Sequence, residues 1–201
     1  MPVRPASRRY SWAPATLALY VVLGTAYTVL RALDVGGPAV LLKALLMPTL
    51  LLWVVLSLGR RTPRLVVAAL ALATVGDVGL EFEAGFLIGM AGFLGMQVCY
   101  VVGFLRLGAW TRVRDRWWVG AAYLVVWLGA NLVLGPRLDD LRIPILVYSL
   151  ALTVMATVAA GVDRRVGLGG LLFLVSDLLI GFDLAELDFA GRGSVVMVTY
   201  L

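Results

Sequence analysis

The stretch Leu65–Leu80, LVVAALALATVGDVGL, is an apolar run that predicts a membrane span, and it carries a carboxylate, Asp77, inside it. A charged side chain at the centre of a bilayer is unfavourable by about 2.5 kcal/mol or more, so such residues usually persist because they function. A second apolar run repeats this arrangement around Asp177. Val, Asp and Phe recur at one constant offset in Val75–Phe82 and Val175–Phe182. Two acids in matching positions predict one shared site.

The composition indicates a helical protein that crosses the membrane several times. Hydrophobic residues make up 62% of the 201 residues and charged residues 14%, and the mean hydropathy is +0.97. The charged fraction is far below the value of roughly 25% that is typical of soluble domains. The chain has no histidine, which excludes Ser-His-Asp and Cys-His catalysis and removes the usual nitrogen ligands of zinc. We therefore expect neither a metal nor a cofactor.

The apolar runs predict a single integral membrane domain over residues 1–201, an all-α bundle with seven spans and the start of an eighth. The predicted spans are Trp12–Leu30, Ala39–Leu58, Leu65–Leu80, Phe86–Leu105, Trp117–Leu134, Ile143–Val162 and Val166–Phe182. After Gly193 about eight apolar residues remain, or roughly 12 Å of helix. Either the last helix is a half-span or the native chain continues past Leu201. Four spans per half would make the offset between the aspartates a parallel 4+4 repeat.

The charges of the predicted loops place the N-terminus in the cytoplasm, because arginines concentrate in alternate loops. The inside segments hold Arg4, Arg8, Arg9, Arg60, Arg61, Arg64, Arg106, Arg112, Arg114, Arg116, Arg164 and Arg165. The outside segments hold Arg31, Arg137, Arg142 and Arg192 with Glu81, Glu83, Asp139, Asp140, Asp183, Glu186 and Asp188. The net charge of +5 and the pI near 9.8 therefore reflect topology, and we do not expect nucleic-acid binding.

The same topology places both aspartates in the outer half of the membrane, about 17 Å from the cytoplasmic ends of their spans. Other polar side chains reach this level and predict a common chamber; they are Tyr27, Lys43, Asn131 and Tyr148. Each has a simpler interpretation. Tyr and Asn near span ends also serve as interface anchors or as hydrogen-bonding groups between helices, and Lys43 could extend to the surface. The aspartates could instead form a structural ion pair with Lys43.

The string Gly76–Leu80, GDVGL, carries a family resemblance. It is followed by Phe86, Gly89, Phe93 and Tyr100 at characteristic spacings, and then by Phe173–Asp177, FLVSD. With Lys43 and Pro48 in the second span, this pattern resembles the YhhN family of membrane proteins, which includes the lysoplasmalogenases.

The resemblance implies eight spans, an aspartate pair as the catalytic centre, and hydrolysis of the vinyl ether bond of lysoplasmalogens to a fatty aldehyde and a glycerophospho-alcohol. Asp77 and Asp177 would then be catalytic. Their common depth makes Tyr27, Lys43, Asn131 and Tyr148 the predicted substrate-binding residues. The partner would be a lysophospholipid within the bilayer, and the location a bacterial plasma membrane. One position departs from the family pattern, because this chain has Gln97 where many relatives carry a histidine.

The chemistry fits the residues independently of the resemblance. A vinyl ether is labile to acid, because protonation of its β-carbon gives an oxocarbenium ion that water captures. Two carboxyl groups can supply the proton and a compensating negative charge, as in glycosidases. Lys43 is the best candidate to meet the phosphate of the lipid. The alternative function is a proton-coupled transporter that uses the same two aspartates. An intramembrane aspartyl protease is a poor match, because Thr74 occupies the first glycine of its GxGD signature.

Overall fold

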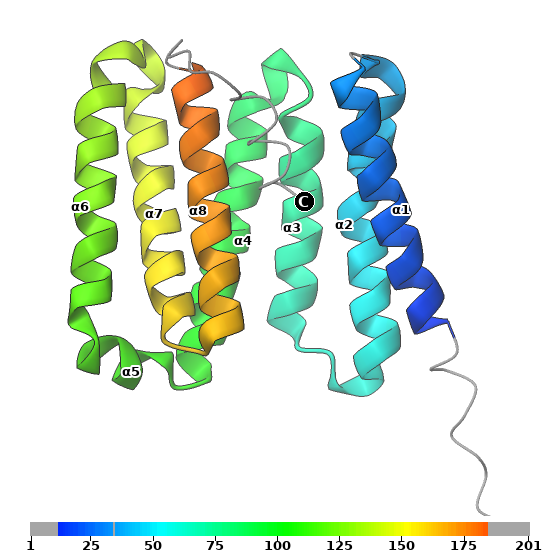
Figure 1. Cartoon of the computed structure of the whole chain (residues 1–201), viewed down its shortest axis with the longest axis horizontal. Helices are drawn as coiled ribbons and strands as arrows, with labels where there is room; N and C mark the ends of the chain where they lie inside the picture. Colours follow the sequence, from blue (N-terminus) through cyan, green and yellow to red (C-terminus); the bar gives the residue numbers. More distant parts are fainter. Residues whose placement is uncertain (1–11, 34, 185–201) are drawn as a thin grey trace, which may run out of the picture. The chain divides into compact units, whose positions relative to one another are not determined.

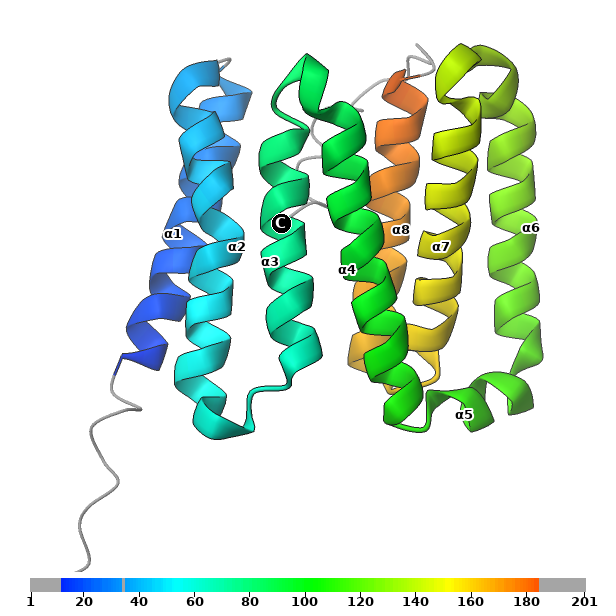
Figure 2. The ribbon, with the colours of Figure 1, turned by 180° about the vertical axis from the view of Figure 1, so that it is seen from behind.

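The computed structural model describes residues 12–33 and 35–184, and every regular element in these ranges is a helix (Figures 1 and 2). The eight α-helices of the described ranges are α1 (Ala13–Ala32), α2 (Gly36–Leu58), α3 (Arg64–Gly79), α4 (Phe86–Arg106), α5 (Ala109–Asp115), α6 (Trp117–Leu134), α7 (Arg142–Ala160) and α8 (Arg164–Leu184). Short 3₁₀ turns, η1 (Gly59–Arg61), η2 (Glu83–Gly85), η3 (Gly135–Arg137) and η4 (Asp139–Leu141), lie in the connections. The all-α prediction is confirmed.

Each of the seven predicted spans corresponds to a long helix. Within the described part of the chain, six helices are long and apolar enough to cross a membrane, namely α1, α2, α4, α6, α7 and α8. Helix α3 has 16 residues, or about 24 Å of axis, which is shorter than a bilayer core of about 30 Å. The eighth predicted segment lies outside the described residues, so the eight-span count and the 4+4 repeat stay predictions. The protein is an integral membrane protein.

The chain divides into two compact units, Met1–Met96 (unit 1) and Gln97–Leu201 (unit 2). The expectation of a single domain stays a prediction. In unit 1, α1 packs along α2, and α2 packs along α3. Tyr27, Ala39 and Leu46 are buried in this unit.

Helices α3 and α4 approach closely through glycines. A Cβ atom built on Gly79 would lie 2.6 Å from the backbone nitrogen of Gly89, and one built on Gly92 would lie 2.7 Å from that of Gly76. Small residues allow such close approach between membrane helices, where packing contributes much of the association energy. These glycines therefore fix the position of the last turn of α3, which carries Asp77.

Unit 2 has a core of aliphatic and aromatic side chains between α7, α8 and the second half of α4. Its buried members are Leu152, Met155, Ala156 and Leu174, and Tyr100, Val101, Phe104, Tyr123 and Phe173 pack against them. A second cluster at the other end of α8 is formed by Leu134 and Leu138 with Ala130, Ile145, Leu178 and Phe182. Together the two clusters hold the middle and the far end of α8 against its neighbours.

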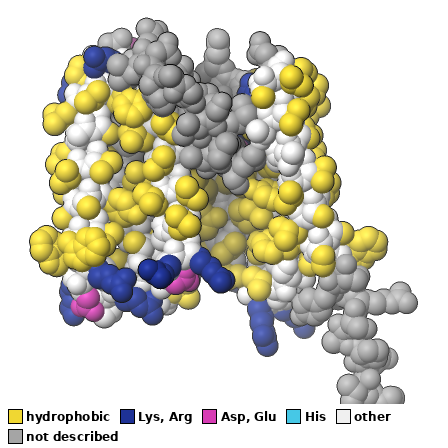
Figure 3. All heavy atoms as spheres, in the orientation of Figure 1, with side chains coloured by type: hydrophobic (Ala, Val, Ile, Leu, Met, Phe, Trp, Pro, Cys, Tyr) yellow, Lys and Arg dark blue, Asp and Glu magenta, His cyan; other side chains and the backbone are white. Residues whose placement is uncertain are grey.

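Helix α5 was not predicted, because seven residues in a charged loop give no hydropathy signal. Gly108, at φ 77°, is in the left-handed conformation, so the chain turns after α4, and the next residues form α5. Its Arg112 Nη1 donates to the carbonyls of Gly161 and Val162 at 3.1 and 2.8 Å, which ties α5 to the end of α7. In the space-filling view, Lys and Arg side chains gather at the helix ends while hydrophobic side chains cover the helix lengths (Figure 3).

Asp163 forms the N-cap of α8. Its Oδ1 accepts hydrogen bonds from the backbone N–H groups of Val166 and Arg165 at 3.0 and 2.7 Å. These bonds hold the pKa of the carboxyl below its usual value, because they stabilise the charged form. A depressed folded-state pKa contributes stability above the unfolded-state pKa, and this contribution is lost as the pH falls through the folded-state value.

We therefore expect Asp163→Ala to lower the midpoint of thermal unfolding by a few degrees at neutral pH, because the cap hydrogen bonds are lost. The difference from the unmodified protein should shrink in acid, where the native carboxyl is protonated. Thermal melts of purified protein at several pH values measure this. Asp163→Asn is the matched control, since it keeps a capping oxygen that does not titrate. A difference for Asp163→Ala that is independent of pH would contradict the assigned cap.

Candidate functional site

Asp77 lies in the last turn of α3 and is 1% exposed. Gly76 and Gly79 flank it, and the ring of Phe93 lies so close to Gly76 that a Cβ there would be 2.7 Å from it. Among the described residues, neither carboxylate oxygen of Asp77 has a hydrogen-bond partner. A buried polar group without a partner is costly, and such groups in native proteins call for a functional explanation. Asp77 therefore remains the central residue of the candidate site.

Three side chains of unit 1 lie within electrostatic reach of Asp77. Lys43 attracts its carboxylate and Glu81 repels it. Tyr20, on α1, also interacts with it electrostatically. Groups on α1, on α2 and in the turn after α3 therefore act on the carboxyl group of Asp77. Lys43 favours the negative charge of this group, and Glu81 disfavours it.

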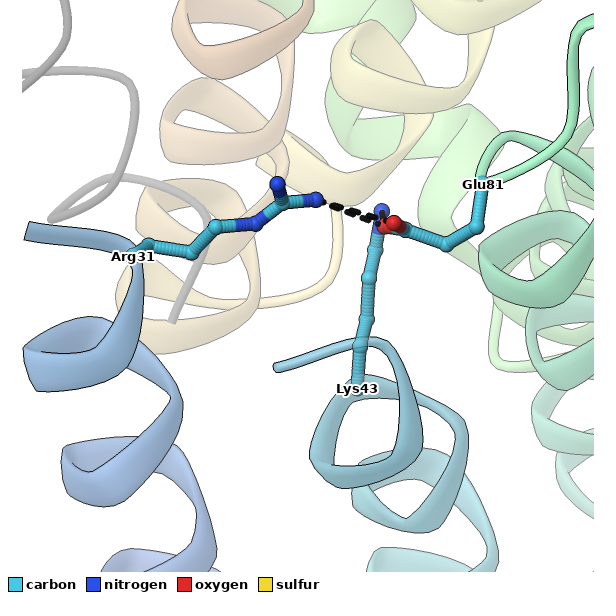
Figure 4. Close-up of polar contacts among 3 residues, drawn as sticks. All are labelled: Arg31, Lys43 and Glu81. Carbon is cyan, nitrogen blue, oxygen red and sulfur yellow. Dashed lines mark hydrogen bonds and ion pairs between the residues drawn. The ribbon is translucent and has the colours of Figure 1, made fainter. Parts of the chain in front are cut away.

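Lys43 forms an ion cluster with Glu81 and Arg31, shown in Figure 4. The ammonium Nζ of Lys43 donates to Glu81 Oε1 at 2.8 Å, and Arg31 Nη2 donates to Glu81 Oε2 at 2.9 Å and to Oε1 at 3.2 Å. The guanidinium of Arg31 lies over the ring of Tyr27, 5.9 Å from its centroid. We call Arg31, Lys43 and Glu81 the ion triad. It brings together the C-terminal end of α1, the N-terminal half of α2 and the turn that follows α3.

The ion triad argues against two interpretations that the sequence left open for Lys43, namely extension of its side chain to the surface and a direct ion pair with Asp77. The residue is 8% exposed, so its charge is held within unit 1 and does not extend to the surface. Its hydrogen-bonded partner is Glu81, one helical turn beyond Asp77, and not Asp77 itself. Sequence reasoning assigned Glu81 to an outside loop and missed it as a partner. The spacing of four residues from Asp77, which places both acids on one helix face, is the signal that could have found it.

Asp177 lies on α8 in unit 2, where the phenol of Tyr148 on α7 donates a hydrogen bond to its Oδ2. Its neighbour Ser176 is 3% exposed, and no described residue bonds to the Ser176 hydroxyl oxygen. The structure thus places two of the predicted site residues in direct contact. In this structure Tyr148 binds the carboxyl group of Asp177, whereas the sequence predicted that it binds the substrate.

Two further polar residues of unit 2, Asn131 and Gln97, differ in whether their side chains have a hydrogen-bond partner among the described residues. Asn131 Nδ2 donates to the carbonyl of Trp127 at 2.9 Å on the same helix, and Trp127 Nε1 donates to Ser149 Oγ at 3.0 Å, which links α6 to α7. Gln97, on α4, is fully buried, and its amide atoms lack a hydrogen-bond partner among the residues that the structure describes. Position 97 is therefore a buried polar position in this chain.

The predicted site residues fall into two groups. Tyr27, Lys43 and Asp77 belong to unit 1, and Asn131, Tyr148 and Asp177 belong to unit 2. Each group contains one carboxyl group on an apolar helix. A single chamber that contains both aspartates stays a prediction.

These features define a polytopic helical membrane protein with a buried carboxyl group on α3 and a partly buried one on α8. The model of the YhhN family matches residues 38–201, and the chain belongs to this family. It is also similar to human lysoplasmalogenase TMEM86B, with 30% identity over 154 residues, which are 74% of this chain. The chain spans 63% of the length of that relative. No solved structure matches the chain.

Proposed function

We propose that this protein is a membrane-embedded hydrolase that cleaves the vinyl ether bond of lysoplasmalogen-type lipids. The observation that carries the proposal is Asp77, a carboxyl group buried in an apolar helix without a hydrogen-bond partner among the described residues. Family membership and the similarity to a protein named lysoplasmalogenase support the same class of substrate. A lipid substrate also suits a site among membrane helices, because its chain can stay in the hydrocarbon.

The proposed reaction needs one proton donor and one negative charge. A carboxylic acid protonates the β-carbon of the vinyl ether, and the resulting oxocarbenium ion is stabilised by the carboxylate of the second aspartate. Water adds to the α-carbon, and the hemiacetal collapses to a fatty aldehyde and a glycerophospho-alcohol, which returns the proton. General acid catalysis of this kind contributes about 10²- to 10⁴-fold, so stabilisation of the cation must supply much of the remaining acceleration.

The contacts of the two aspartates are compatible with one of them acting as the proton donor and the other as the stabilising carboxylate. Asp77 has both oxygens free of hydrogen bonds from described residues, and Asp177 already accepts one from Tyr148. A carboxyl group that approaches the substrate carbon needs an oxygen without a hydrogen-bond partner, and among the described residues Asp77 meets this condition. Tyr148 would keep the Asp177 side chain in one orientation.

Release of fatty aldehyde from a purified lysoplasmalogen by the purified protein tests the proposal directly. Its absence under conditions where the protein is folded would contradict the hydrolase function. Proton or solute movement in sealed liposomes without aldehyde release would instead favour the transporter alternative. The matched control substrate is the saturated alkyl ether lysolipid, which has no bond for an acid to activate.

Lys43→Met should raise KM for a lysoplasmalogen about tenfold while lowering kcat less, because a phosphate-binding lysine contributes mainly to ground-state binding. An alkenylglycerol, which lacks the phosphate, should be affected less. Steady-state kinetics with both substrates measure the difference. If Lys43 instead acts through Asp77, the variant should shift the pH–rate profile and leave KM nearly unchanged, which would contradict phosphate binding.

A further inference from the structure

We propose that Arg31 and Lys43 together form the binding site for the phosphate of an ether lysophospholipid, and that Glu81 occupies this site as an internal anion until the phosphate displaces it. The inference deepens the proposed function and rests on it for the class of lipid. It adds Arg31 and Glu81, which no sequence pattern assigned to the site.

The geometry of the ion triad is that of an oxyanion site. Two cations from different helices converge on one carboxylate at 2.8–3.2 Å, Arg31 on both oxygens and Lys43 on Oε1 (Figure 4). A carboxylate and a phosphate both present two oxygens to such donors, and guanidinium and ammonium groups are the usual ligands of phosphate. The Glu81 carboxylate thus marks where the phosphate oxygens would lie.

The charge of the triad also favours an additional anion. Arg31 and Lys43 supply two positive charges, and Glu81 supplies one negative charge. One positive charge is therefore left for a ligand or for the nearby Asp77, which interacts with Lys43 electrostatically. A phosphate diester also carries one negative charge, so it would replace the charge of Glu81 at the two cations if that side chain moved away.

The exposure of the three side chains gives the direction of entry. The Arg31 side chain is 36% exposed, whereas those of Lys43 and Glu81 are 9% and 7% exposed. A ligand therefore meets Arg31 first. Large apolar side chains are exposed near this end in the sequence, among them Val29 on α1, Leu33 directly after α1, and Leu41 on α2. A lysolipid could place its chain along these side chains and its phosphate at the guanidinium.

The alternative role of the triad is purely structural, since a buried ion pair can hold helices together without binding a ligand. The two roles predict opposite effects of Glu81→Gln. If Glu81 competes with the phosphate, its removal should tighten binding of a phospholipid. If Glu81 only holds the two cations in place, its removal should weaken binding or prevent folding.

The test is a binding measurement on the full-length purified protein with an ether lysophospholipid that has a saturated alkyl chain. This probe cannot be hydrolysed, so the result does not depend on aldehyde release, and failure of this proposal can be told from failure of the hydrolase function. The matching alkylglycerol without phosphate is the control ligand. Arg31→Gln should weaken binding of the phospholipid about 10- to 100-fold, the loss expected for a charged hydrogen-bonding group, and leave binding of the alkylglycerol unchanged. Glu81→Gln should bind the phospholipid severalfold more tightly.

Two further variants keep the proposal falsifiable. Arg31→Lys retains the charge and should recover part of the affinity, even if Glu81→Gln fails to fold. Arg137→Gln removes an exposed arginine of unit 2, whose Nη1 donates to the carbonyl of Val133, and should leave both affinities unchanged. Equal loss of phospholipid and alkylglycerol binding in Arg31→Gln would overturn the proposal, as would weaker phospholipid binding in a folded Glu81→Gln protein.

Discussion

Asparagine in place of either Asp77 or Asp177 is expected to abolish the release of fatty aldehyde from lysoplasmalogen, with kcat lowered about 10²- to 10⁴-fold or more. An asparagine has nearly the same shape as an aspartate but can neither supply a carboxylic proton nor carry a negative charge. The Asp177→Asn side chain can still accept the hydrogen bond from Tyr148 through its oxygen. The packing of α3 and α8 should therefore survive both substitutions.

The double variant distinguishes a shared site from two independent ones. If the two carboxyl groups act on one substrate, removing both should be little worse than removing either, because groups that act as a unit are strongly non-additive. Turnover above about a tenth of the original in either single variant would remove that residue from the mechanism. Asp115→Asn, at an exposed carboxylate on α5, is the matched control and should keep full activity. Loss of folded protein in both single variants would favour a structural role.

Gly92→Ala is expected to destabilise the protein, because the added methyl group would meet the backbone of α3. The new Cβ would lie 2.7 Å from the backbone nitrogen of Gly76 and 2.9 Å from the carbonyl oxygen of Leu72. Backbone atoms cannot rotate away as a side chain can, so α3 and α4 must separate. Overpacking of this kind costs about 1–3 kcal/mol, measured as a lower unfolding midpoint of the purified protein.

Gly129→Ala on α6 is the matched control, because a Cβ built there meets nothing within 4 Å apart from its chain neighbours and the nearby backbone of its own helix. Alanine is favoured over glycine inside a helix, so this variant should be as stable as the parent protein or slightly more stable. Equal melting of Gly92→Ala and the parent protein would contradict the close contact between α3 and α4. Loss of activity along with stability in Gly92→Ala would also agree with the position of Asp77 beside this contact.

The sequence predicted the long helices well, because their apolar runs end at Arg, Gly or Pro residues, which can be recognised from the sequence without a structure. The predicted span Trp117–Leu134 matches α6 at both ends, and Leu65–Leu80 differs from α3 by one residue at each end. Helix α5 escaped prediction because its signals are a left-handed Gly108 and a contact with α7, neither of which hydropathy records.

The site was predictable only in part, for a different physical reason. A carboxylate in an apolar run is visible in any sequence, which is why Asp77 and Asp177 stood out. The partners depend on the rotation of each helix about its axis, and helices that are apolar all round do not define that rotation. The loop charges of Glu81 and Arg31 therefore indicate only topology in the sequence, although the structure joins Glu81 to both Arg31 and Lys43.

Lys43 is the only lysine in the chain. Apart from the α-amino group, a reagent that acylates amines therefore has a single side-chain target, and that target is the ammonium held against Glu81. An amine in an ion pair must leave its partner and lose a proton before it can attack an acylating reagent. The rate of acylation at this one position, followed by the mass of a single peptide, thus reports how often the triad opens in the native protein, without a mutation or an introduced label.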